Sequence, residues 1–90
     1  MKVYWQNRKR GQNLVLSDDD GDQEEEIGGF RETKRGIDAY ARTMGYEPER
    51  SRKGFDSVQE AKDFVVSFSP WEIFGVRGVE VDSEARPIPD

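Results

Sequence analysis

The chain has 90 residues, of which 33% are hydrophobic and 37% charged, and its net charge is −5 at neutral pH. This length favours one domain with a thin core. Cysteine and histidine are both absent, which excludes disulfides and thiol nucleophiles and removes the commonest general base and transition-metal ligand. We therefore expect a protein that is not an enzyme and that uses no cofactor or metal.

The composition also bears on location and partners. Small secreted domains usually need disulfides, so the missing cysteines favour the cytoplasm. No apolar run approaches the roughly 18 residues that would cross a membrane, and residues 1–7 are too polar for a signal peptide. We expect no membrane association, and a monomer or weak dimer.

The first expected element is an antiparallel hairpin. Residues 2–7 (KVYWQN) and 14–16 (LVL) are rich in β-branched and aromatic residues, which favour strands. The basic segment 8–11 between them ends in a glycine suited to a turn. Residues 27–31 are expected to add a third strand, weakened by its two glycines.

The spacing then changes to a helical period. Apolar side chains recur at i, i+3, i+4 and i+7, as on one face of a helix. These side chains are Ile37, Tyr40, Ala41 and Met44. They predict a helix over residues 34–44.

The C-terminal half begins with an expected edge strand over residues 50–55. Residues 57–60 (SVQE) form a capping box, which predicts a second helix over residues 58–68. A serine–proline pair then predicts a helical turn over residues 70–74. Valines alternate with a glutamate over residues 79–81, as in a final strand.

These elements predict an α+β fold, in which a small, mostly antiparallel sheet carries two helices on one face. The sheet would consist of the N-terminal hairpin and one or two further strands. The domain is expected to cover residues 1–81, and residues 82–90 to form an extended flexible tail. The expected core contains Trp5, Leu14, Leu16, Phe30, Ile37, Tyr40, Met44, Phe55, Ala61, Phe64, Val65 and Phe68.

Charge is segregated along the chain. Residues 1–17 carry four basic and no acidic side chains, residues 18–26 carry seven acidic and no basic ones, and residues 27–55 carry seven basic and four acidic ones. A dense block of like charge repels itself and stays solvated. We therefore expect an acidic mobile loop at residues 18–26, set within a basic body.

The acidic block is the first candidate site. Its aspartates are Asp18, Asp19, Asp20 and Asp22. A calcium loop requires glycine at position 6 and glutamate at position 12, and neither requirement is met when counting from Asp18. Only weak divalent-cation binding is expected here, and the alternative is a solvated loop.

Basic side chains next to aromatic residues form the second candidate site. Arg8, Lys9 and Arg10 lie at the expected hairpin tip, close in sequence to two aromatic residues. This pattern is typical of nucleic-acid binding, although the overall acidity argues against it. The basic residues that could join the same surface are Arg31, Lys34, Arg35, Arg50, Arg52 and Lys53.

Trp71 is a third candidate, because tryptophan side chains dominate the binding energy at protein interfaces. If Trp71 is exposed, it would dock against another protein. The alternative is that it closes a thin core.

Part of the sequence is similar to a known module. Residues 8–11 (RKRG), 45–48 (GYEP) and 53–61 (KGFDSVQEA) resemble the RNA/DNA-hybrid-binding module at the N-terminus of many eukaryotic-type ribonucleases H. The resemblance implies nucleic-acid binding. However, residues 18–26 stand where that module has an aromatic-rich stretch, so we assign no family.

Three functional hypotheses follow. The first is a non-enzymatic interaction module that binds an unidentified protein through charged surfaces. The second is nucleic-acid binding by the basic hairpin tip and residues 50–53, for which the acidic block would compete. The third is weak divalent-cation binding by the acidic block.

Overall fold

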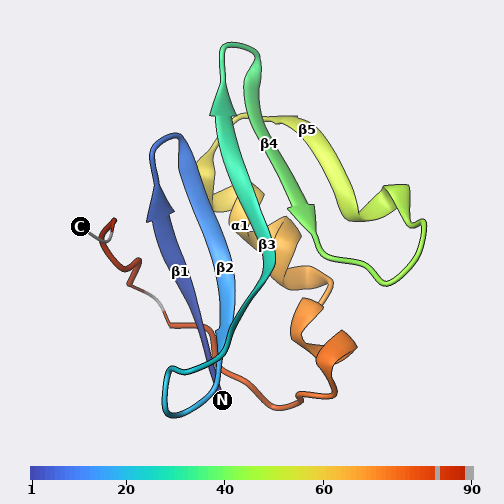
Figure 1. The fold of residues 1–90 in the computed structure, drawn as a ribbon. Helices are drawn as coiled ribbons and strands as arrows, with labels where there is room; N and C mark the ends of the chain where they lie inside the picture. The colour runs from blue at the N-terminus through green and yellow to red at the C-terminus, as the bar shows by residue number, and fades with distance from the viewer. Residues whose placement is uncertain (83, 89–90) are drawn as a thin grey trace.

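The computed structural model describes residues 1–82 and 84–88. Five strands form one antiparallel sheet in which each strand pairs with the next along the chain (Figure 1). The strands are β1 (Lys2–Arg8), β2 (Gly11–Ser17), β3 (Glu24–Thr33), β4 (Gly36–Ala41) and β5 (Ser51–Phe55). The expected edge strand at residues 50–55 is confirmed as β5.

One α-helix lies within the described residues and covers one face of the sheet. This helix, α1 (Val58–Ser67), packs against β3, β4 and β5. Two 3-10 turns, η1 (Pro48–Arg50) and η2 (Pro70–Phe74), complete the fold. The prediction of a small sheet with two helices is therefore wrong, because the sheet has five strands and a single α-helix packs on it.

The N-terminal hairpin is confirmed and is longer than expected. β1 and β2 pair from Lys2 with Ser17 to Arg8 with Gly11. Only Lys9 and Arg10 lie between the strands, so both side chains stand at the tip of a two-residue turn.

The helix predicted over residues 34–44 is replaced by a second hairpin, formed by β3 and β4. Thr33 pairs with Gly36 across a two-residue turn, and Gly36 has a φ of 119°, which favours glycine. Ile37, Ala39 and Ala41 are buried at a period of two. The helical spacing was misleading because Tyr40 points to the other face and Met44, 82% exposed, lies beyond the strand.

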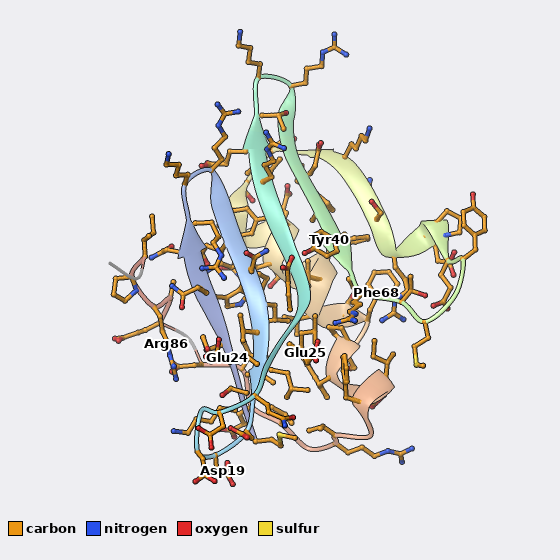
Figure 2. All side chains as sticks on the ribbon, viewed as in Figure 1. Asp19, Glu24, Glu25, Tyr40, Phe68 and Arg86 are labelled. Carbon is orange, nitrogen blue, oxygen red and sulfur yellow. The ribbon has the colours of Figure 1, made fainter. Side chains whose placement is uncertain are left out.

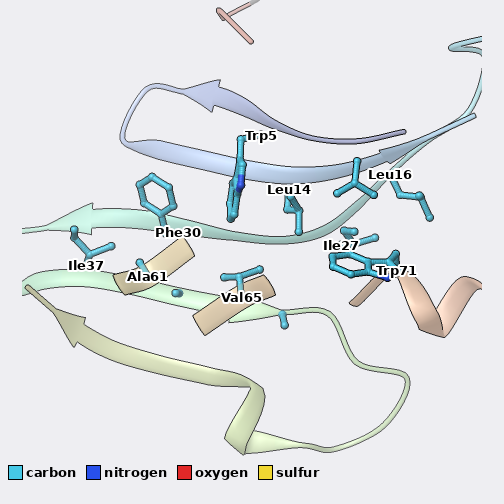
Figure 3. Close-up of a cluster of buried hydrophobic side chains, with 12 residues drawn as sticks. Trp5, Leu14, Leu16, Ile27, Phe30, Ile37, Ala61, Val65 and Trp71 are labelled. Atoms are coloured by element: carbon cyan, nitrogen blue, oxygen red, sulfur yellow. The ribbon is translucent and has the colours of Figure 1, made fainter. Parts of the chain in front are cut away.

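The core lies between the sheet and the layer formed by α1 and η2 (Figure 3). Seven expected core side chains are confirmed as buried: Trp5, Leu14, Leu16, Phe30, Ile37, Ala61 and Val65. Three expected phenylalanines, Phe55, Phe64 and Phe68, are partly buried against them. The expectation is wrong for Tyr40 and Met44, which are exposed because residues 34–44 are not helical.

Helix α1 begins as its capping box predicts, since the Ser57 side chain accepts a hydrogen bond from the backbone N–H of Glu60 at 3.1 Å. The turn predicted at residues 70–74 is also confirmed, as η2, and Gly75 ends it with a φ of 77°. Ser69 makes no side-chain capping bond there.

The C-terminal segment runs parallel to β1 along its outer edge. Val81 forms a bridge with Val3, and Arg86 forms one with Gln6. The Gln6 amide nitrogen also donates to the carbonyl oxygens of Arg86 and Pro87, at 3.2 and 2.6 Å. The described part of the expected tail is thus hydrogen-bonded to the sheet, while residues 83, 89 and 90 lie outside the described residues.

Among the described residues, no helix combines the length and the apolar character that crossing a membrane requires.

Candidate functional site

The face of the sheet opposite α1 carries polar side chains, and we call it the open face (Figure 2). It holds the residues that alternate with the core side chains, because successive residues of a strand point to opposite faces. Asn13, Gly29 and Tyr40 form one row across β2, β3 and β4. The row can be predicted only if residues 36–41 are assigned to a strand. The incorrect prediction of a helix over residues 34–44 therefore prevented its recognition from the sequence.

A chain of hydrogen bonds crosses the open face from β1 to β4. Arg8 Nε donates to Asn13 Oδ1 at 2.7 Å, and Asn13 Nδ2 donates to Glu26 Oε1 at 2.9 Å. The Tyr40 hydroxyl donates to the same Glu26 oxygen. Bonds between exposed groups add only about 0.5–1.5 kcal/mol each to stability, so their main effect is to hold these side chains in position.

Gly29 leaves the space that this chain of hydrogen bonds requires. A Cβ atom at this position would lie 2.8 Å from Asn13 Nδ2 and 2.8 Å from the backbone oxygen of Gln12. A side chain here would therefore displace the Asn13 amide.

A shallow hollow of about 310 Å³ lies on the open face over β3 and β4, and we call it the open-face hollow. Asp38 is half-buried in its lining, and Asp38 Oδ1 accepts a hydrogen bond from the Gly54 N–H at 3.3 Å. Arg31 lies opposite Asp38 in the register, but among the described residues no ion pair joins them. The polar side chains that line this hollow are Asn13, Glu26, Arg31, Asp38, Tyr40 and Ser51.

Basic side chains gather at one end of the sheet. In an antiparallel meander the β1–β2 and β3–β4 turns lie at the same end, and the end of β5 joins them because Phe55 pairs with Ile37. We call this group the basic rim. It consists of Arg8, Lys9, Arg10, Arg31, Lys34, Arg35 and Lys53, all of which are exposed.

Basic side chains outnumber acidic ones at the basic rim, where Glu32 and Asp38 lie among them. None of the seven basic side chains takes part in an ion pair within the part of the chain that the structure describes. Two shallow hollows lie between them, one beside Arg10 and Arg31 and one beside Lys34 and Lys53. Unpaired cations from three segments of the chain form a surface suited to an extended anion.

The acidic block lies at the opposite end of the sheet, in the β2–β3 connection. Backbone bonds from Asp18 to Gln23 and from Gly21 to Asp18 close this turn. The Met1 ammonium group lies 2.5 Å from Asp19 Oδ1, and this contact lowers the pKa of the Asp19 carboxyl. Glu24, Glu25 and Glu26 belong to β3 rather than to the loop.

The acidic turn and the basic rim are separated by the length of β2. Its seven residues span roughly 20 Å at about 3.4 Å per residue. This exceeds the screening length of about 8 Å at physiological salt. The acidic turn is therefore too far away to compete for the basic rim of its own chain.

The remaining candidates from the sequence pack against aromatic or core side chains, although Arg52 also lies beside Lys53 of the basic rim. Arg50 packs over the Phe68 ring at 5.1 Å, and Arg52 over the Phe55 ring at 5.3 Å, on the helix side of the sheet. Trp71 is 8% exposed and belongs to the core. Its indole surface is thus not available to a partner.

Tyr4 anchors the C-terminal segment at the β1 edge. The Arg86 guanidinium carbon lies 3.6 Å from the centre of the Tyr4 ring, and the hydroxyl donates to Glu24 at 2.9 Å. Burial and then the bond to Glu24 raise the pKa of Tyr4 above its usual 10.0. Because Arg86 stacks on it, Tyr4 has no free ring face on that side.

Within residues 1–82 and 84–88, no three acidic side chains are grouped so that they could hold a metal ion. Weak cation binding by the acidic block, which was expected from its composition, therefore has no geometric support in this part of the chain.

Comparisons with known proteins identify no relative of this chain. No family model, no curated protein and no solved structure matches this chain. Before residues 45–48 of the resemblance to the hybrid-binding module, the structure has β4 and not the helix predicted over residues 34–44.

Proposed function

We propose that this chain is a non-enzymatic, cytoplasmic module that binds nucleic acid through the basic rim. The observation that carries the proposal is the convergence of seven exposed basic side chains, without ion-pair partners among the described residues, at one end of the sheet. Phosphates release condensed counterions when such side chains bind them, which favours association at low salt.

The overall charge of −5 does not conflict with this proposal. The acidic turn lies at the far end of the sheet, beyond the screening length. At the basic rim itself, seven basic side chains outnumber the acidic side chains of Glu32 and Asp38. The molecule would approach a polyanion with its basic end first.

The test is fluorescence anisotropy with labelled 12-nucleotide DNA and RNA at about 50 mM salt, where phosphate contacts are strongest. Replacing Lys34 and Arg35 by glutamate should weaken binding at least tenfold. The control replaces Lys2 and Arg77 by glutamate, which changes the net charge equally but away from the rim, since Lys2 pairs with Ser17. Equal loss in both variants would show that only net charge matters and would contradict a rim site.

A protein partner is the second candidate function, and the connection between β4 and β5 favours it. Met44 and Tyr46 in this loop are 82% and 93% exposed, although Thr43 ties the loop through hydrogen bonds with Gly45. Exposed apolar side chains close together in one loop suit a protein interface. In a pull-down from extract, replacing Met44 and Tyr46 by serine should abolish retention of a partner that the Lys34/Arg35 variant still retains.

A further inference from the structure

The open-face hollow has a chemistry that the basic rim does not explain. It joins the rim through Arg31, which belongs to both, and two residue pairs separate its Arg31–Asp38 pair from the β3–β4 turn. Its volume of about 310 Å³ is at the lower end of the range of about 300–1,000 Å³ for small-molecule pockets. A hollow of this size suits a single ring system and not a folded partner.

An aromatic side chain forms one side of this hollow. Tyr40 is 36% exposed, and its hydroxyl bond to Glu26 fixes the far end of the ring. Gly29, its neighbour on β3, has no side chain, and the Asn13 amide lies in the space beside it. A planar group can approach the exposed part of the Tyr40 ring from the hollow, and stacking of a base on an aromatic ring is worth about 1–3 kcal/mol.

Three charged side chains line the hollow, and two of them, Arg31 and Asp38, have opposite charges and face each other across β3 and β4. Direct cross-strand partners have Cβ atoms about 4.5–5.5 Å apart, yet no ion pair joins Arg31 and Asp38 among the described residues. The Asp38 carboxylate has about four acceptor sites, and a hydrogen bond from Gly54 uses one. A ligand with donors beside acceptors would satisfy both side chains together.

We infer that, if the basic rim binds nucleic acid as proposed, the open-face hollow seats one unpaired guanine of a single strand, stacked on Tyr40 and read by Asp38 and Arg31. Guanine presents two adjacent donors, N1–H and the N2 amino group, which fit the two oxygens of a carboxylate. Its O6 and N7 are acceptors that match an arginine fork. Adenine, cytosine and uracil each lack the pair of adjacent donors, and adenine presents a donor instead of an acceptor beside N7.

A single strand follows from the same chemistry. In a duplex the N1–H and N2 amino groups of guanine are already paired, so Asp38 cannot reach them. Recognition of an unstacked base by an aromatic ring and polar side chains requires a single-stranded segment. The module would then prefer single-stranded over double-stranded nucleic acid at equal length.

The test uses fluorescence anisotropy with dT12 strands that carry one central guanine, adenine or inosine, and with a 12-base-pair duplex. We expect the guanine strand to bind about tenfold more tightly than the adenine strand, within the range for one bidentate base contact. Inosine lacks the N2 amino group and should lose most of this preference.

The variant Asp38→Asn separates this inference from the proposed function. It retains an acceptor for the Gly54 N–H but replaces a carboxylate oxygen by an NH₂ donor, so the guanine preference should vanish while dT12 binding is not weakened. Asp20→Asn, an equal charge change in the acidic turn, should retain the preference. Amide NMR shifts of the unaltered chain give a second measurement, in which the guanine strand should move Gly29, Asp38 and Tyr40 more than the adenine strand does.

The possible failures are distinguishable. The guanine, adenine and inosine strands could bind equally well to the unaltered chain and all bind more weakly to the Lys34/Arg35 variant. This result would refute the guanine site in the open-face hollow but would support nucleic-acid binding by the basic rim. Duplex binding as tight as single-strand binding would likewise overturn the inference alone. If no strand binds at about 50 mM salt, both the inference and the proposed function are refuted.

Discussion

The salt dependence of binding is the most quantitative consequence of the basic rim. For single strands, log K falls with log salt with a slope of about −0.7 for each phosphate contact. If all seven rim side chains contact phosphates, the slope is about −5, and its magnitude cannot be larger. This slope corresponds to a roughly thousandfold loss of affinity between 50 and 200 mM salt.

Replacing Lys34 and Arg35 by alanine removes two of these contacts. The slope should fall by about 1.4, so that the same change in salt costs only about a hundredfold in affinity. Both side chains are exposed at the β3–β4 turn, so the fold should be unaffected. The assay is an anisotropy titration at four or five salt concentrations between these limits.

The matched control replaces Lys2 and Arg77 by alanine. These residues contribute the same charge but lie outside the rim, so the slope should remain that of the unaltered chain. An unchanged slope in the Lys34/Arg35 variant, or an equal reduction in the control, would refute the assignment of phosphate contacts to the rim.

Three further predictions concern the fold. Gly28→Ala should lower the free energy of unfolding in urea by about 1–3 kcal/mol. A Cβ at this position would lie 2.6 Å from Val65 Cγ1 and 2.9 Å from the Tyr40 carbonyl oxygen. The control Gly45→Ala should lower it far less, because a Cβ there would lie in open space. Ser57→Ala should cost about 1 kcal/mol in the same assay, since it removes the cap of α1; no loss would mean that the capping bond is unimportant. Tyr4 should ionise above pH 10.0 in an absorbance titration and closer to 10.0 in Glu24→Gln. Because folding raises the Tyr4 pKa, its contribution to stability is complete below pH 10 and is lost as pH rises through the folded pKa; stability that does not fall there would contradict this linkage.

Local signals in the sequence were sufficient where short-range chemistry decides the structure. The hairpin turn within residues 8–11, the cap at Ser57 and the helical turn over residues 70–74 are each confirmed. In each case the determining groups lie within a few residues of one another, so no distant partner is needed to specify the conformation.

Residues 34–44 show where this reasoning fails. Ile37, Ala39 and Ala41 recur with the period of two that is typical of a strand. Ile37 and Ala41 also recur with Tyr40 and Met44 at the spacing of one helix face. So short a segment fits both patterns. The choice depends on β3 and β5, which supply backbone partners on each side of β4. Those partners are distant in sequence, and tertiary context overrides local propensity.

The functional surface depends on the same choice. The residue types were evident from the sequence, which has a basic hairpin tip, further basic residues at 31–35 and 52–53, and an acidic block. Only the meander brings the β1–β2 and β3–β4 turns to one end and sends the acidic block to the other. Likewise, the row of Asn13, Gly29 and Tyr40 exists only once three strands are in register. The sequence alone determined which charges the protein has and where its first turn and its helix cap lie, whereas strand pairing between distant segments decided the β3–β4 turn and which charges share a surface.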